Sequence, residues 1–304
     1  MKILVTGGAG YIGNFLVRKL LAEGYQVTII DSFQYGTSAI LDLVNHPKFH
    51  VTEKDIRNIE KSDIQDTEFI FHLAAVSGLP ACRKDTYTAQ TVNVDATRKL
   101  VKLLSPDQII IYASTTSLYG SSGKKRDEKS TPEPLSQYSQ TKYQAEKIIM
   151  EHHSSVSLRF ATLFGVSACM RTDLLVNNFV YRALTDRSLV VFDPLSVRTY
   201  LHLKDAISAY LLVLRLISKM KGNIYNVGTN SLNFSKLDLA RHIQNLIDCE
   251  VYQSHLTDID KRNFIISYDR INSLGFKSIV SLDDGIKELI KLYSFYRPDE
   301  NRDV

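Results

Sequence analysis

The sequence predicts an α/β fold in which a doubly wound parallel sheet is accompanied by a smaller α/β lobe. In the first 165 residues, short apolar runs alternate with segments of helical periodicity. Such alternation is typical of βαβ units, whose parallel strands are covered by helices on both faces. A glycine-rich turn, Gly7–Gly13, separates the first strand from the first helix. After Gly165 the pattern becomes irregular, which favours a second lobe rather than a longer sheet.

Each element of the regular half follows from its apolar pattern. Lys2–Thr6 is predicted as a buried strand, and Tyr11–Glu23 as a helix that Gly24 terminates. The further predicted strands are Gln26–Ile30, Glu68–Leu73, Gln108–Ala113 and Ser157–Phe160. The further predicted helices are Ala89–Leu104 and Ser139–His152.

The second half gives fewer and shorter signals. The predicted helices are Asn178–Thr185, Leu203–Leu216, Ser235–Ile247 with Ser235 as N-cap, and Leu282–Tyr296. The predicted strands are Ser188–Phe192 and Ile224–Gly228. We therefore expect residues 1–165 and about 203–232 to form a dinucleotide-binding domain. Residues from about 166–202 and 233–304 are expected to form the substrate-binding lobe.

Composition and charge exclude several classes of protein. Apolar residues make up 44% and charged residues 23%, as in ordinary globular proteins. No apolar run approaches the roughly 20 residues of a membrane-spanning helix. The cysteines, Cys82, Cys169 and Cys249, are too few and too scattered for a disulfide framework or a zinc site. A net charge of +4 is too small to indicate a nucleic-acid-binding surface. We expect a cytoplasmic protein without a metal, membrane or nucleic-acid partner.

The glycine-rich turn carries the pattern of a dinucleotide site. Gly8, Gly10 and Gly13 match G-x-G-x-x-G, and Gly7, Gly10 and Gly13 match a second spacing. Glycines allow the tight turn and the close approach of the pyrophosphate, which the helix N-terminus attracts. Asp31 ends the second strand, where a carboxylate accepts hydrogen bonds from the ribose of NAD and repels the 2′-phosphate of NADP. The pattern predicts a Rossmann-type NAD site. The alternative interpretations are a glycine-rich turn that binds no ligand and an Asp31 that is only a solvated residue at the end of a strand.

A second pattern predicts proton transfer. Tyr138 and Lys142 lie four residues apart on one helical face. The strand Gln108–Ala113 runs into a hydroxyl-rich segment, and sites in parallel sheets lie at the carboxyl ends of strands. Tyr138 is the predicted base that removes a proton from an alcohol. The Lys142 ammonium and a cationic nicotinamide are expected to favour its phenolate.

In the order of these motifs, the chain resembles extended short-chain dehydrogenases/reductases of the NAD-dependent epimerase/dehydratase family, which act on nucleotide sugars. The resemblance spans nearly the whole chain. It also rests on the segments Asp55–Arg57, His72–Ala75, Leu158–Gly165, Val197–His202 and Tyr225–Gly228.

The resemblance implies the roles of individual residues. Catalysis is assigned to Thr115, Tyr138 and Lys142, with Ser114 as second candidate for the hydroxyl. Cofactor binding is assigned to Gly7, Gly10, Tyr11, Ile12, Gly13, Asp31, Asp55, Ile56, Ala74, Ala75, Asn93, Tyr138 and Lys142. Substrate binding is assigned to Thr115, Asn178, Arg198 and Arg262.

Several structural alternatives stay open at this point. Asn93 and Asn178 are candidates for helix caps, and the two arginines for surface ion pairs. Cys82 is expected to be a buried, inert thiol. The resemblance also implies a homodimer, and Val101, Ile148 and Ile149 are expected to face outward towards a partner helix.

The departures from the family pattern bear on the reaction. Thr116 and Ser117 stand where the family's 4,6-dehydratases carry Asp-Glu, and Ser117 also replaces the carboxylate of the decarboxylases and the cysteine of the fucose-synthase type. Thr162 replaces a frequent asparagine, so that role is not assigned. The remaining hydroxyl, Tyr138 and Lys142 favour 4-epimerisation of a nucleotide sugar. A single reduction or oxidation, and more distantly a non-catalytic NAD-binding protein, remain the alternatives.

Overall fold

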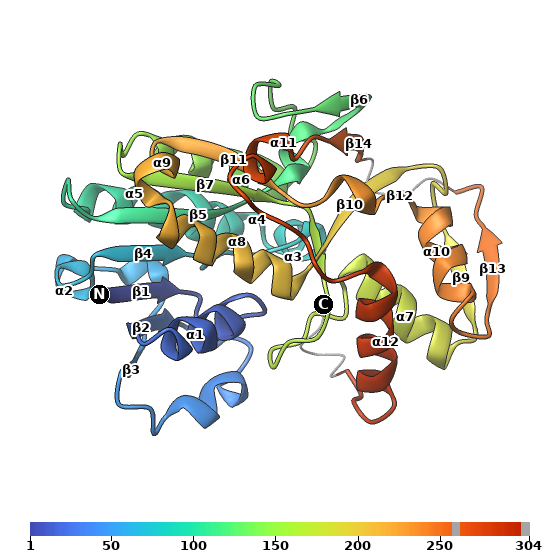
Figure 1. Cartoon of the computed structure of the whole chain (residues 1–304), viewed down its shortest axis with the longest axis horizontal. Helices are drawn as coiled ribbons and strands as arrows, with labels where there is room; N and C mark the ends of the chain where they lie inside the picture. The colour runs from blue at the N-terminus through green and yellow to red at the C-terminus, as the bar shows by residue number, and fades with distance from the viewer. Residues whose placement is uncertain (257–261, 299–304) are drawn as a thin grey trace.

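In the computed structural model, which describes residues 1–256 and 262–298, a seven-stranded parallel sheet has the order β11-β7-β5-β4-β1-β2-β3. Its strands are β1 (Lys2–Thr6), β2 (Gln26–Asp31), β3 (Phe49–Glu53), β4 (Phe69–His72), β5 (Ile109–Thr115), β7 (Ser155–Phe160) and β11 (Asn223–Val227). The order reverses between β1 and β4, and ligands bind in open α/β sheets outside the carboxyl ends at such a reversal. The predicted Rossmann-type sheet is confirmed (Figure 1).

Helices cover both faces of this sheet. Ile3 and Val5 of β1 join the core formed with α1 (Gly13–Ala22) and α8 (Leu203–Arg215). Leu4 points the other way, into the core formed with α5 (Ala96–Leu103) and α6 (Gln137–Met150). The inner strands β1, β4 and β5 are buried on both faces and are therefore nearly continuous apolar runs, which made them recognisable. Shorter helices in this half are α2 (Lys61–Ile64), α3 (Leu79–Lys84), α4 (Thr86–Gln90) and α9 (Ile217–Met220).

The second group of elements lies beside the carboxyl ends of the main sheet (Figure 1, at the right). A small sheet has the order β12-β10-β8, and two strands pair as β13-β9. These strands are β8 (Thr162–Phe164), β9 (Ser188–Val191), β10 (Val197–His202), β12 (Asn233–Ser235) and β13 (Glu250–Gln253). The helices here are α7 (Leu175–Thr185), α10 (Lys236–Gln244) and α12 (Leu282–Tyr293). We call these strands and helices the small lobe; the predicted domain boundaries around it stay a prediction.

A further pair, β6 (Ser121–Arg126) with β14 (Asn263–Ile266), lies outside the main sheet, and α11 (Asp269–Asn272) follows β14. The sequence analysis missed β6 because Ser121–Arg126 carries no apolar alternation. It also missed β3, β8, β10, β12, β13 and β14.

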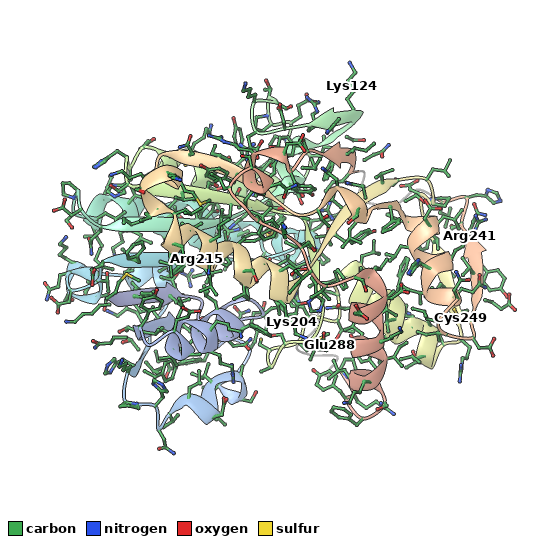
Figure 2. The ribbon with its side chains drawn as sticks, in the orientation of Figure 1. Lys124, Lys204, Arg215, Arg241, Cys249 and Glu288 are labelled. Carbon is green, nitrogen blue, oxygen red and sulfur yellow. The ribbon has the colours of Figure 1, made fainter. Side chains whose placement is uncertain are left out.

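Two side-chain contacts fasten the small lobe to the sheet. Glu288 of α12 accepts a hydrogen bond from Lys204 of α8 at 3.2 Å and lies 3.1 Å from His202 Nε2. Figure 2 shows Lys204 and Glu288 side by side at this junction. The Tyr11 hydroxyl donates to the Gly165 carbonyl at 2.8 Å. The Tyr11 contact holds the glycine turn against the start of the small lobe, and the Glu288 contacts hold α12 against α8.

The predicted outward face of the helix Ser139–His152 is wrong. Ile148 is 8% exposed, and Ile149 is fully buried in the core that α5 and α6 form on the sheet. Val101 is partly buried against the same core. The apolar stripe of α6 serves the fold because this helix packs on β5, β7 and α5 together. A homodimer stays a prediction that rests on the resemblance, and light scattering decides it.

No helix in the described part of the chain combines the length and apolarity needed to cross a membrane.

Candidate active site

Two adjoining cavities lie at the reversal point of the sheet. The larger has a volume of about 980 Å³ and the smaller about 280 Å³. Tyr11, Ala75, Ser77 and Arg171 line both of them, so the cavities meet at these residues. A ligand in one cavity therefore lies next to a ligand in the other.

The glycine turn forms the floor of the smaller cavity. Gly7 has φ +71°, and a Cβ there would lie 2.8 Å from the Ala74 nitrogen. A Cβ on Gly13 would lie 2.1 Å from the Gly7 carbonyl oxygen, which no side chain tolerates. A Cβ on Gly10 would meet only that same oxygen, at 3.4 Å. Gly7 and Gly13 are thus required by the backbone, whereas Gly10 leaves room beside the turn for a ligand.

The structure brings most predicted cofactor residues to this smaller cavity. Its lining includes Gly7, Gly10, Tyr11, Ile12, Gly13, Asp31, Asp55, Ile56, Ala74 and Ala75. Asp31 is not merely solvated, because its carboxylate accepts from the backbone N–H groups of Ala9 and Phe33, each at 2.9 Å. Asp55 accepts from Arg57, whose hydrogen bonds hold the pKa of this carboxyl below its usual value. The two acids thus flank the cavity in fixed positions.

Asn93 lies behind the cavities and does not cap a helix. The predicted helix Ala89–Leu104 is interrupted by a π-helical turn, Thr91–Asp95. The wider turn lets the Asn93 amide accept from Val76 N–H at 2.8 Å and donate to the Thr141 hydroxyl at 3.0 Å. Such turns are frequent at functional sites. Asn93 therefore ties the loop after β4 to α6.

Cys82 lies beside the same loop. Its side chain is buried and its Sγ donates to the Val76 carbonyl at 3.3 Å. Burial raises the pKa of the Cys82 thiol to about 11. A thiol with this pKa is mostly protonated at neutral pH and a poor nucleophile, as expected from the sequence.

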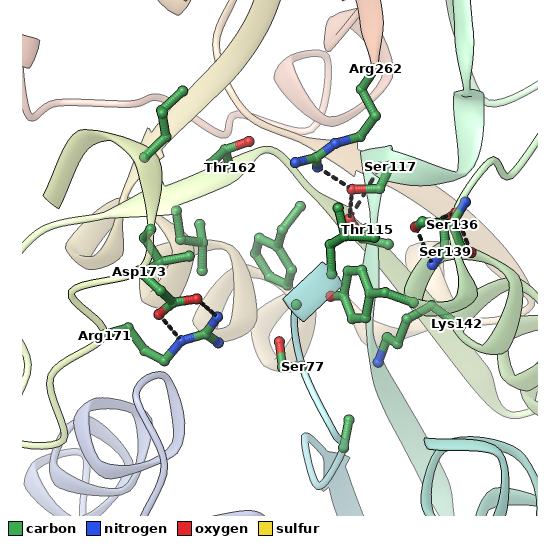
Figure 3. Close-up of a pocket in the computed structure, with 18 of the residues that line it drawn as sticks. Ser77, Thr115, Ser117, Ser136, Ser139, Lys142, Thr162, Arg171, Asp173 and Arg262 are labelled. Atoms are coloured by element: carbon green, nitrogen blue, oxygen red, sulfur yellow. Dashed lines mark hydrogen bonds and ion pairs between the residues drawn. The ribbon is translucent and has the colours of Figure 1, made fainter. Parts of the chain in front are cut away.

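Thr115 ends β5 at the wall of the larger cavity. Its hydroxyl donates to Ser117 Oγ at 2.9 Å, and Arg262 Nη1 donates to the same Ser117 oxygen at 2.5 Å (Figure 3). Thr116 turns away and donates to the Phe160 carbonyl at 3.1 Å. Of these neighbouring hydroxyl residues, Thr115 and Ser117 line the cavity and Thr116 does not.

Tyr138 and Lys142 line the same cavity from the first turns of α6. The Ser136 hydroxyl caps this helix by accepting from Ser139 N–H at 3.1 Å, which fixes where the first turn lies. The structure therefore brings Thr115, Tyr138 and Lys142 together around one space, as the sequence analysis expects.

The charges around Tyr138 differ from those expected. Burial raises the pKa of Tyr138, while a hydrogen bond from Ser77 and the positive charges of Arg171 and Arg262 lower it. The Lys142 ammonium lies over the Tyr112 ring, 4.1 Å from its centroid. Burial lowers the pKa of Lys142 to about 7, and the Glu146 carboxylate opposes this change. The cations that act on the Tyr138 phenol in this structure are thus the two arginines.

Sequence reasoning missed Ser77 and Arg171. Arg171 makes two hydrogen bonds to Asp173, at 2.6 and 2.5 Å, and lines both cavities (Figure 3). It belongs to the irregular stretch after Gly165, where no periodicity marks it. Ser77 follows β4, and its place directly after the segment His72–Ala75 was the signal available.

The predicted substrate residues Asn178, Arg198 and Arg262 also line the larger cavity. Neither Asn177 nor Asn178 caps α7, because this helix begins at Leu175. Asn177 is buried, and its side-chain oxygen accepts a hydrogen bond from Gly165 N–H at 3.0 Å. Arg198 is only 2% exposed, so the alternative of a surface ion pair is wrong for it. The described residues contain no group of three His, Cys, Asp or Glu side chains arranged to hold a metal ion.

Comparison with known proteins identifies the family to which the chain belongs. The model of the NAD dependent epimerase/dehydratase family matches residues 3–228. The chain belongs to this family. The match includes the glycine turn, the hydroxyl segment and the Tyr138–Lys142 pair. The strands and helices of the small lobe that follow residue 228 lie beyond it.

Family relatives with different reactions are about equally similar to this chain. A putative UDP-glucose 4-epimerase of Methanocaldococcus jannaschii is 26% identical over 95% of this chain and 97% of that protein. A dTDP-D-glucose 4,6-dehydratase of Bos taurus is 25% identical over 96% of this chain and 88% of that protein. The structure of a UDP-glucuronic acid 4-epimerase from Bacillus cereus, in complex with UDP-glucuronic acid and NAD, superposes with a TM-score of 0.86 at 26% identity. That superposition covers 97% of this chain and 99% of the other.

This epimerase/dehydratase-family protein is an NAD-dependent enzyme. The family is NAD dependent, and the glycine turn, Asp31 and the residues after β4 form a cradle that fits a dinucleotide. The exposed side of Gly10 and the N-terminus of α1 suit the pyrophosphate, and Asp31 suits the adenine ribose. Lys142 lines the larger cavity, next to Tyr138 and Thr115.

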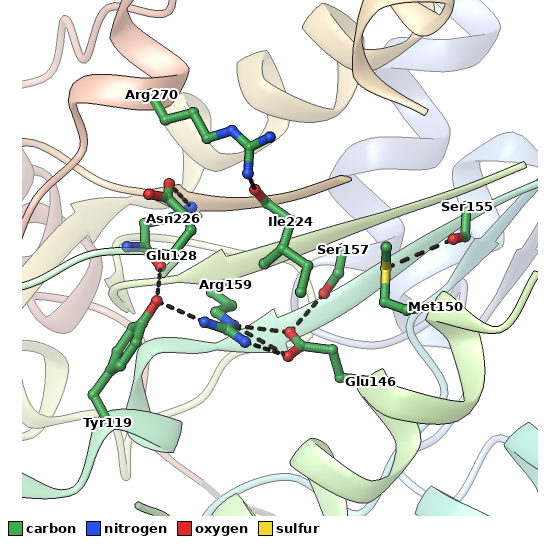
Figure 4. Close-up of polar contacts among 10 residues, drawn as sticks. All are labelled: Tyr119, Glu128, Glu146, Met150, Ser155, Ser157, Arg159, Ile224, Asn226 and Arg270. Atoms are coloured by element: carbon green, nitrogen blue, oxygen red, sulfur yellow. Dashed lines mark hydrogen bonds and ion pairs between the residues drawn. The ribbon is translucent and has the colours of Figure 1, made fainter. Parts of the chain in front are cut away.

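A buried ion pair supports α6, the helix of Tyr138 and Lys142, from behind. Arg159 of β7 bonds Glu146 of α6 at 2.6 Å, and both side chains are at most 3% exposed. Arg159 also donates to the Tyr119 hydroxyl at 2.7 Å, which donates to the Asn226 amide oxygen at 2.8 Å (Figure 4). Glu146 lies one helical turn after Lys142. The network thus links α6 to β7 and β11 and fixes the turn that presents Tyr138 and Lys142.

Proposed function

We propose that the protein is an NAD-dependent nucleotide-sugar 4-epimerase. The observation that carries this proposal is the chemistry of the larger cavity. Thr115, Tyr138 and Lys142 surround it, and among its described lining residues the one carboxylate is Asp173, which Arg171 neutralises. Elimination of water needs a further acid and base at the sugar. Transfer of a hydride from an alcohol and back again needs only the groups present.

Each residue has a defined part in this reaction. Thr115 holds the C4 hydroxyl oxygen, and the Tyr138 phenolate takes its proton as the C4–H bond breaks. When bound, NAD would supply the hydride acceptor and donor for C4 and, in its oxidised form, a positive charge near the phenol. Tyr138 gives its proton back to O4 in the return step. Arg171 and Arg262 favour the phenolate, and Lys142 is placed to hold the ribose.

The size of the larger cavity is compatible with epimerisation of a nucleotide sugar. An epimerase must present both faces of the 4-keto sugar to the same nicotinamide. About 980 Å³ lies at the upper end of small-molecule sites, which span roughly 300–1,000 Å³. This volume leaves room for the sugar to turn about its diphosphate link.

The test is a panel of UDP-, dTDP-, GDP- and CDP-linked hexoses and hexuronates, followed by NMR. The expected product is the C4 epimer, formed without net NADH. Tyr138→Phe is expected to lower kcat by about 10²–10⁴-fold while NAD binding is kept. Tyr143→Phe, on the same helix, is the matched control and keeps activity.

Other products would contradict the proposal. NADH formed or consumed in equal amount to the sugar identifies a dehydrogenase or 4-ketoreductase. A 4-keto-6-deoxy product identifies a dehydratase, and loss of carbon dioxide from a hexuronate identifies a decarboxylase. A Tyr138→Phe variant within a few-fold of wild type would exclude the mechanism.

A further inference from the structure

Tyr296 lines the smaller cavity, although it lies at the opposite end of the chain from the glycine turn. The other lining residues come from positions up to Val92 and from the segment between β8 and α7. Tyr296 follows α12 of the small lobe and is half-buried. The sequence analysis assigns it no role, so its place at the cofactor cavity needs a physical explanation.

A turn after α12 fixes the backbone of Tyr296. Its N–H donates to the Leu292 carbonyl at 2.9 Å, so the helical path continues past the end of α12. The Arg297 guanidinium donates to the carbonyls of Tyr293 and Tyr296, at 2.8 and 3.1 Å. The end of a helix leaves carbonyl groups without intrahelical partners, and a cation is favoured there. These bonds hold the turn in place.

Aromatic packing fixes the ring of Tyr296 as well. Its centroid lies 6.5 Å from that of the Tyr293 ring, which in turn lies 5.2 Å from the Tyr181 ring of α7. Aromatic rings attract one another at centroid separations of roughly 4.5–7 Å. Tyr293 is only 4% exposed, so it forms a buried base for the Tyr296 ring.

The packing of α12 brings this segment to the glycine turn. Gly285 of α12 has no room for a side chain, because a Cβ there would collide with the Phe164 ring of β8. Burial is the main cause of the raised pKa of Tyr11, and Tyr293 is close enough to raise it further. Tyr296, which packs on Tyr293, therefore lies on the side of the cavity where the glycine turn receives the pyrophosphate.

We propose that Tyr296 is a cofactor-binding residue whose ring covers the dinucleotide beside the glycine turn and slows its release. The inference rests on the NAD dependence of the enzyme and not on the proposed epimerisation. A ring over the pyrophosphate excludes water, and the attraction between the pyrophosphate and the helix N-terminus is stronger where water is excluded. Release then requires the ring to move, and such contacts act mainly on the dissociation rate.

The experiment measures displacement of NADH from the loaded protein by excess NAD, followed by stopped-flow fluorescence. Tyr296→Ala removes the ring, and we expect NADH release to become about 10–100-fold faster, with a matching loss of affinity in calorimetry. Tyr296→Phe keeps the ring and is expected to stay within about twofold of wild type. Phe295→Ala is the matched control, because Phe295 is 73% exposed and lies outside the described lining of the cavity.

Three results would overturn the proposal. The first is NADH release from Tyr296→Ala within about twofold of the wild-type rate. The second is an equal acceleration in Phe295→Ala, because loosening of the whole segment would then be the cause. The third is release from Tyr296→Phe as fast as from Tyr296→Ala, because the hydroxyl and not the ring would then hold the cofactor.

The same data separate this inference from the proposed function. Fast release from Tyr296→Ala in a protein whose wild type epimerises no sugar would leave the role of Tyr296 standing and refute the epimerase. Unchanged release in a protein that does epimerise a sugar would do the reverse. Melting temperatures measured without nucleotide are expected to agree within about 2 °C among the variants, which shows that the release rates compare folded proteins.

Discussion

The two halves of the active site are built in opposite ways. Around the glycine turn, main-chain N–H groups face the cofactor cavity, and the lack of side chains on the glycines leaves room for the ligand. The residues of this half lie in consecutive βα units. The wall formed with the small lobe instead carries charged side chains that remote strand pairings bring together. Arg198 of β10 and Lys236, which directly follows β12, both line this wall, and Arg262 reaches Ser117 from the start of the β14·β6 pair. A recognisable motif therefore marks the first half, and its absence leaves the second half free to vary with the substrate.

The difference implies different responses to substitution. In the glycine-turn half, adding an atom is harmful, whereas in the small-lobe half, removing a charge is harmful. Lys142 lines the larger cavity, and its substitution tests the proposed reaction itself.

Lys142→Met should have the largest effect on turnover, a fall in kcat of about 10²–10⁴-fold. The same change should stabilise protein stripped of nucleotide. Burial holds the pKa of Lys142 at about 7, against roughly 10.4 in the unfolded chain. The unfolded state therefore binds more protons between these values, so wild-type stability rises with pH across that window and the burial cost is full below pH 7.

Thermal melts at pH 6 and pH 9.5 check this. The variant should melt higher than wild type at pH 6, by about 2 °C or more, and the gap should shrink at pH 9.5. Lys147→Met, an exposed position on the same helix, should show no such trend. An equal difference in melting temperature at pH 6 and pH 9.5 would show that the destabilisation does not come from burial of the Lys142 charge.

Two glycine variants separate packing from ligand contact in the first half. Gly13→Ala brings Cβ to 2.1 Å from the Gly7 oxygen, so we expect a loss of about 1–3 kcal/mol of stability together with NAD binding. Gly10→Ala meets its nearest atom only at 3.4 Å, so we expect an unchanged melting temperature and NAD affinity reduced about 100-fold. Calorimetry with NAD and thermal melts give both numbers. Equal melting temperatures for the two variants would contradict the distinction between packing at Gly13 and ligand contact at Gly10.

Arg262→Gln sharpens the other side of the comparison. The amide keeps a hydrogen bond to Ser117 but loses the charge near Tyr138 and the sugar. We expect kcat/KM to fall about 10–100-fold and NAD affinity to stay as in wild type. Because Arg262 lowers the pKa of Tyr138, the pH at which activity rises should also move upward. A loss of NAD affinity would show that the two halves are not independent.

Asp31→Asn should have the smallest effect, about tenfold on NAD affinity, because the amide oxygen still accepts one of the two backbone N–H groups. Without the negative charge, discrimination against NADP should decrease. Parallel titrations with NAD and NADP measure this. Wild-type protein that already prefers NADP would contradict the role of Asp31.

The sequence predicted six of the seven strands of the main sheet because the inner strands are apolar runs buried on both faces, and it missed the exposed edge strand β3. Thr115, Tyr138 and Lys142 were predicted because they lie at strand and helix ends that the fold repeats. Tyr296, Arg171 and Ser77 were missed, since their positions depend on helix packing and loop paths that leave no periodicity. The outward face expected for Ile148 and Ile149 was wrong because α6 packs on β5, β7 and α5 at once.

The order of the parts along the chain has a consequence for synthesis on the ribosome. All seven strands of the main sheet, the glycine turn, Asp31 and Lys142 have been made once Val227 is complete. Lys236 and Arg262 follow up to several seconds later, at about 5–20 residues per second. We expect a nascent chain to load its dinucleotide before the opposite wall of the pocket is complete. Cellular NAD supply would then influence how much enzyme matures, before any sugar is encountered.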